Sequence, residues 1–185
     1  MKHPLTFIPQ NLRKPMFYVF LALTIVIFGI FRVLDQPLRT AAAPNGIVSF
    51  ELAGTPEKAF QIMASWEPIN YQGPAIGRVR GYLFATFGLG LDYLFMPTYA
   101  LALSLGLLLA IGEKKNWYSI FAAWMGWGVF AAALFDAVEN YALWHILTGS
   151  IFSPYPAIAA WCATLKFILL IVGLVTVVSG RLFSK

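Results

Sequence analysis

Charged side chains are scarce in this sequence. Lysine, arginine, aspartate and glutamate together make up 11% of its 185 residues, whereas apolar types make up 59%. A soluble domain has roughly 25% charged and 45–50% apolar residues. The shortage of charge therefore excludes an ordinary water-soluble domain. By its length the chain forms one domain, and so much apolar surface can be covered only by a lipid bilayer.

Cysteine and histidine are almost absent as well. Cys162 is the single cysteine, so the chain can form no internal disulfide and has no paired cysteines for zinc. The two histidines are His3, in the N-terminal tail, and His145, so the paired histidines of a four-helix haem protein are missing. Asp136-x-x-Glu139 has the spacing of a di-metal motif but lacks its histidine. We therefore expect neither a metal nor a cofactor.

Motifs for nucleophilic, metal-dependent or nucleotide chemistry are also missing. The sequence contains no GxSxG, no HExxH and no P-loop. Its net charge of +5 comes from basic residues at the ends of apolar runs. This is the pattern of membrane orientation, and it argues against a nucleic-acid partner. Whether the protein is an enzyme stays uncertain, and a non-catalytic protein is favoured.

What the sequence does contain is four long apolar runs. A bilayer core about 30 Å thick needs roughly 20 residues of helix. We predict transmembrane helices over residues 16–34, 81–112, 117–147 and 157–179. The second is expected to kink at Pro97. The predicted fold class is an all-α integral membrane protein, a bundle of four transmembrane helices.

The first apolar run also has some features of a signal peptide, because Ala41-Ala42-Ala43 follows it. However, Arg32, Asp35 and Arg39 separate the run from that cleavage site, and Pro44 would follow the cut. We expect this run to be a retained membrane anchor.

Basic residues in the short flanking segments predict the orientation. They gather on one side of the four predicted helices, at Lys2, Arg13, Lys14, Lys114, Lys115, Arg181 and Lys185. The tails 1–15 and 180–185 and the loop 113–116 are then cytoplasmic, and the loop 148–156 lies outside. We expect a multi-pass protein of the cell membrane, most simply a bacterial inner membrane, with both termini inside.

The segment 35–80, between the first two runs, is too patterned for a plain loop. Asn45-Gly46 marks a turn. Apolar residues then occupy every second position, at Val48, Phe50 and Leu52. This alternation is typical of a half-buried strand, so we predict a strand here.

A helix is predicted directly after this strand. Thr55 is placed to cap it and Pro56 to be its first residue. An apolar face recurs with helical spacing at Ala59, Ile62, Met63 and Trp66. We therefore predict a small extracytoplasmic strand-plus-helix cap, followed by an irregular connector over 68–77. A lid or docking surface and a plain structured linker are both open interpretations of the cap.

Ionisable residues lie inside the predicted spans in spite of their cost there. They are Asp92, Asp136, Glu139 and Lys166. At about 1.5 Å per residue, Asp92 and Asp136 lie about 30 Å, and Lys166 about 21 Å, from the cytoplasmic helix ends. All therefore belong to the outer half of the membrane. Asn140 shares a helix face with Asp136 and Glu139, and Tyr99 shares one with Asp92.

Two interpretations of this polar cluster remain. Lys166 can pair with Asp136 or Glu139 and fix the helix register, or the cluster can line a binding pocket. We predict a non-catalytic protein that binds a lipid, a small apolar ligand, or a partner subunit, which includes a second copy of the chain. One alternative is a proton-coupled small-molecule transporter that works as an oligomer. The other is a membrane enzyme that uses Asp136 and Glu139 in acid–base chemistry on a lipid-like substrate.

Overall fold

Four long helices dominate the computed structural model, which describes residues 2–66, 80–111, 117–150, 152 and 154–183. They are α1 (Gln10–Leu34), α4 (Arg80–Ala110), α5 (Trp117–Leu147) and α6 (Tyr155–Phe183). Each is long and apolar enough to cross a membrane. The predicted all-α, four-span architecture is therefore confirmed, and the chain is a multi-pass membrane protein. The predicted loop 113–116 and connector 68–77 lie outside the described residues.

The contacts of the chain divide it into two compact units. Unit 1 comprises Met1–Ile27, Phe95–Phe135 and Leu165–Lys185, and unit 2 comprises Phe28–Leu94 and Asp136–Thr164. Each long helix therefore contributes one part to each unit. Pro97 lies inside α4, within the unit 1 part of that helix.

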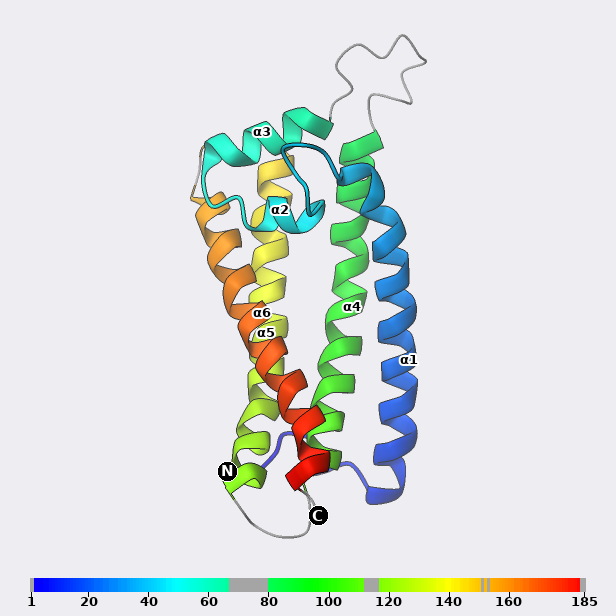
Figure 1. Cartoon of the computed structure of the whole chain (residues 1–185). Coiled ribbons are helices and arrows are strands. Elements are labelled where there is room, and N and C mark those ends of the chain that lie inside the picture. Colours follow the sequence, from blue (N-terminus) through cyan, green and yellow to red (C-terminus); the bar gives the residue numbers. More distant parts are fainter. Residues whose placement is uncertain (1, 67–79, 112–116, 151, 153, 184–185) are drawn as a thin grey trace. The chain divides into compact units, whose positions relative to one another are not determined.

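The core of unit 2 is built around α3 (Pro56–Trp66), which lies across the neighbouring ends of α5 and α6 (Figure 1). Its predicted apolar face is confirmed, because four of its residues are buried: Ala59, Ile62, Met63 and Trp66. They pack in one cluster with Leu143 and Ile146 of α5 and Ala159 of α6. Removing such a side chain from water contributes about 1.5–3 kcal/mol, so α3 is held chiefly by this face.

The strand predicted before α3 is wrong. Residues Ile47–Glu51 form a short helix, α2, and the described part of the chain contains no strand. Ile47 and Phe50, three residues apart, both contact the unit 2 core, whereas Leu52 is 44% exposed. A lone strand would leave its backbone N–H and C=O groups without partners, and a helix satisfies them internally. Six residues of alternation are too few to decide between the two periods.

The start of α3 agrees with its sequence signals. The Thr55 hydroxyl accepts a hydrogen bond from the Lys58 backbone N–H at 3.3 Å, and Pro56 is the first helical residue. The capping oxygen satisfies one of the N–H groups that a helix start leaves open.

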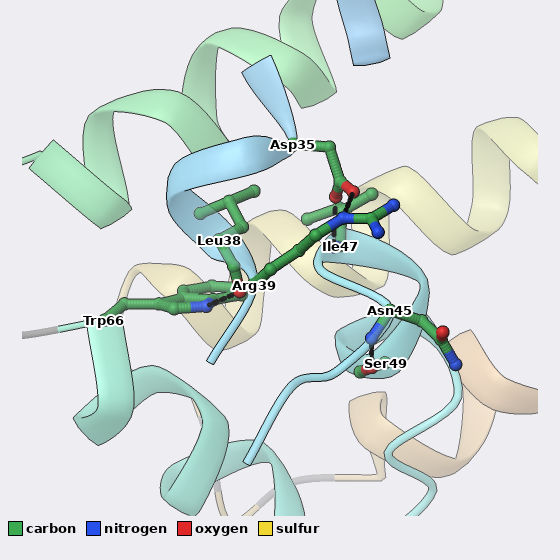
Figure 2. A network of polar contacts seen from close by, with 7 residues as sticks. All are labelled: Asp35, Leu38, Arg39, Asn45, Ile47, Ser49 and Trp66. Carbon is green, nitrogen blue, oxygen red and sulfur yellow. Dashed lines mark hydrogen bonds and ion pairs between the residues drawn. The ribbon is translucent and has the colours of Figure 1, made fainter. Parts of the chain in front are cut away.

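A polar network centred on Asp35 fixes the chain between α1 and α2 (Figure 2). One carboxylate oxygen of Asp35 accepts a hydrogen bond from the Ile47 backbone N–H at 2.8 Å, and the other accepts one from the Arg39 Nε–H at 2.9 Å. Gly46 precedes α2 with a φ of 59°, and a Cβ there would lie 1.9 Å from the Asp35 carboxylate. The turn therefore requires glycine for its conformation and for its space.

The same network ties α3 to the short 3-10 helix Gln36–Leu38 (Figure 2). The Trp66 indole N–H donates to the Leu38 carbonyl at 2.8 Å, and its ring meets Phe50 edge-on with centroids 5.2 Å apart. Trp66 thus joins three segments of unit 2 and has its single polar atom satisfied.

Unit 1 also has an apolar core, and its helices approach each other closely. Its core contains Leu105 and Leu108 of α4 together with Leu5 and Ile8 from the segment before α1. Close approach needs small residues. Gly173 of α6, for example, lies where an added Cβ would be 3.2 Å from a Leu103 methyl group.

Candidate functional site

The unit 2 part of α5 carries a buried polar face. Asp136, Glu139 and Asn140, spaced over one helical turn, are 2%, 0% and 2% exposed. Two carboxyl groups and one amide are therefore removed from solvent along the same side of an apolar helix. We call these three residues the Asp136–Asn140 face.

Asn140 links this face to α4. Its side-chain amide donates to Oδ2 of Asp92 at 2.9 Å and to the Leu89 carbonyl at 3.3 Å. Asp92 itself is half-buried. The structure thus brings together two of the predicted site residues from different helices. The amide donates one hydrogen bond to a carboxylate inside a membrane-spanning segment.

Tyr99 and Lys166 belong to unit 1 rather than unit 2. Tyr99 is buried, with its ring edge-on to Phe95 at a centroid distance of 5.2 Å. Lys166 is also buried, and its Nζ lies 4.9 Å from the centroid of the Phe167 ring, within cation–π range. The pairing of Lys166 with an acid stays a prediction from sequence.

The buried acids and Lys166 are not isolated charges. Asp136, Glu139 and Lys166 each take part in at least one further interaction. This matters because a lone ion removed from water is very costly, whereas paired or hydrogen-bonded ions are tolerated.

The chemistry available to the Asp136–Asn140 face is hydrogen bonding. A carboxylate accepts, a protonated carboxyl also donates, and the Asn140 amide does both. Such a set suits the hydroxyl, carbonyl or ester groups of a ligand that is otherwise apolar. Among the described residues, no three His, Cys, Asp or Glu side chains are grouped to hold a metal ion.

An aromatic stack next to this face was not anticipated. The His145 ring lies parallel to that of Tyr155 at 4.6 Å, and Tyr141 meets His145 edge-on at 4.5 Å. Tyr141 and His145, four residues apart on α5, could have indicated their contact. The third ring comes from the start of α6 and carries no local signal. His145 is thus placed by ring packing at the end of α5.

His3 is the second residue whose place was missed. The sequence analysis predicts a cytoplasmic tail at this residue, but its side chain is only 3% exposed and lies against Gly126 of α5. Apolar Leu5 and Ile8 beside it were the available signal, since a solvated tail has no need of them.

Comparison with protein-family models, with curated proteins and with solved structures gave no match for this chain. Fold and site define its class as a multi-pass helical membrane protein with a buried acid–amide face.

Proposed function

We propose that this protein binds a lipid or a small apolar molecule with a hydrogen-bonding head group, beside the Asp136–Asn140 face. The burial of Asp136, Glu139 and Asn140 in an apolar, membrane-length helix carries the proposal. Polar groups at such positions are costly, and in membrane proteins they mark ligand sites more often than elsewhere.

A route from the lipid to this face is supplied by α4. Gly88 lies one helical turn before Asp92, and a Cβ at Gly88 would meet no atom within 4 Å. The helix surface beside the half-buried Asp92 is therefore open. An alkyl chain lying over Gly88 would place its head group at the Asp92 carboxylate and the Asn140 amide.

The competing explanation is purely structural. The bond from Asn140 to Asp92 would hold α4 against α5 with or without a ligand. The two explanations differ at Gly88, which takes no part in that bond. Filling the space over Gly88 removes a ligand's place and leaves the helix contact intact.

The test is native mass spectrometry of the protein released from nanodiscs, which are prepared from the membranes of its expression host. Wild type is compared with Gly88→Leu and with Gly29→Leu, because Gly29 of α1 is equally open. We expect a retained lipid or apolar molecule in wild type and Gly29→Leu, and its loss from Gly88→Leu. Equal retention in all three, or none in wild type, would contradict the proposal.

We also propose that both termini are cytoplasmic and that the protein resides in the cell membrane. The support is the gathering of Lys2, Arg13 and Lys14 before the first span and the Lys114-Lys115 pair between the second and third. A reporter that is active only in the cytoplasm, fused to either end, should be active. The same reporter inserted after Gly54 should be silent.

A further inference from the structure

The segment before α1 is folded back onto unit 1 (Figure 1). His3, Leu5 and Ile8 are 3%, 5% and 6% exposed. Hydrogen bonds hold the segment at both ends. The Trp127 indole N–H donates to the Lys2 carbonyl at 3.2 Å, and the Arg13 Nε–H donates to the Ile8 carbonyl at 2.9 Å. A segment expected in solvent is therefore part of the packed unit.

The His3 ring packs against α5 at Gly126, where only glycine leaves room for it. A Cβ on Gly126 would lie 2.3 Å from Nε2 of His3. The other ring nitrogen, Nδ1, accepts the Leu5 backbone N–H at 3.2 Å. Because Nδ1 is an acceptor, the docked ring is the neutral tautomer with its proton on Nε2.

We propose that residues 2–8 are a releasable plug of unit 1, docked while His3 is neutral and released when His3 takes up a proton. A second proton on the ring would go to Nδ1, where it would face the Leu5 N–H, donor against donor. The charged ring would also have to be buried in place of a neutral one, which is costly. Both effects oppose docking, and neither depends on a ligand at the Asp136–Asn140 face.

The electrostatic surroundings of His3 act in the same direction. Burial lowers its pKa from 6.5 to about 4; a hydrogen bond to the Ser104 backbone opposes this shift, and the Arg13 charge adds to it. Arg13 is the charged group of α1 that acts on the ring. From α4 and α5 the neighbours are Ser104 and Gly126, which do not titrate.

The sign of the pH effect follows from that lowered pKa. The released segment binds a proton near pH 6.5 and the docked one near pH 4, so docking weakens as the pH falls between these values. Relative to pH 8, the docking constant should fall about 4-fold at pH 6 and about 30-fold at pH 5. Above pH 7 it should be nearly constant.

Hydrogen exchange measured by mass spectrometry tests the plug in nanodiscs. The N–H groups of Leu5, Thr6 and Ile8 are bonded inside the segment and report its release. The control is His3→Asn, whose side-chain oxygen can accept the Leu5 N–H but does not titrate. Comparing both proteins at each pH cancels the intrinsic pH dependence of exchange.

We expect the protection of this segment to fall about 30-fold between pH 8 and pH 5 in wild type and less than 3-fold in His3→Asn. Gly126→Ala should remove the protection already at pH 8. Unchanged protection in wild type, or an equal loss in both proteins, would overturn the proposal. If the His3→Asn segment is already unprotected at pH 8, a titration of wild type by histidine-selective NMR takes the place of this comparison. A His3 pKa near 4 supports the plug, and a value of 6 or above overturns it.

Discussion

The two units of this protein are held together in partly different ways. Both units have an apolar core, and in unit 2 polar side chains also join segments that are far apart in the sequence, as Trp66 does with the Leu38 carbonyl. In unit 1 the segment before α1 packs through its apolar residues and through the close approach of His3 to Gly126, and two side chains hydrogen-bond to its carbonyl groups. The binding face that we propose lies in unit 2, and the releasable segment that we propose lies in unit 1.

The largest effect that should separate the units is the loss of Trp66. Trp66→Ala removes a buried ring, its edge contact with Phe50 and its bond to Leu38. We expect it to lower the free energy of unfolding by about 3–5 kcal/mol. Thermal unfolding in detergent measures this change.

The matched variant is Trp117→Ala in unit 1, where the ring is 68% exposed. Its cost in detergent should stay below about 1 kcal/mol, since few protein contacts are lost. Equal losses for the two tryptophans would break the contrast between the units.

A smaller effect is expected from the polar tie between α4 and α5. Asn140→Leu removes the donor to Asp92 and leaves a carboxylate in a membrane-spanning segment without that amide. Hydrogen bonds to charged groups contribute about 1.5–3 kcal/mol, and the unfolding free energy should fall by that amount.

Ser104→Ala is the corresponding change in unit 1. Its hydroxyl donates to the Gly126 carbonyl at 3.4 Å, a long bond between neutral groups, so about 0.5 kcal/mol is expected. Chemical denaturation of both variants in one detergent gives the comparison. A larger loss for Ser104→Ala would show that unit 1 depends on directional bonds at least as much as unit 2.

The features that could be predicted from sequence are those encoded locally. Four spans follow from the length of the apolar runs, and α3 follows from Thr55, Pro56 and the apolar spacing after them. The shared face of Asp136, Glu139 and Asn140 follows from helical geometry alone.

The features that were missed depend on distant partners. The helix α2, which replaces the predicted strand, is held at its first N–H group by Asp35, twelve positions earlier. The partner of Asn140 lies 48 positions away on α4, and Gly126, against which His3 packs, lies on α5. No local pattern contains these pairs. The sequence supplies the residue types of the site, and only tertiary packing selects which of them meet.

A further small effect tests how much of unit 2 is fixed locally. Thr55→Ala removes the cap of α3 and leaves the Lys58 N–H without that acceptor. The expected cost is about 1 kcal/mol, because such caps contribute 0.5–2 kcal/mol. Thr148→Ala at the end of α5 is the control, since its hydroxyl bonds to Trp144 and His145 carbonyls of its own helix. That change should cost almost nothing. If Thr55→Ala also left the thermal unfolding unchanged, α3 would be held by its buried face alone. The polar contacts of unit 2 would then select a geometry without adding to its stability.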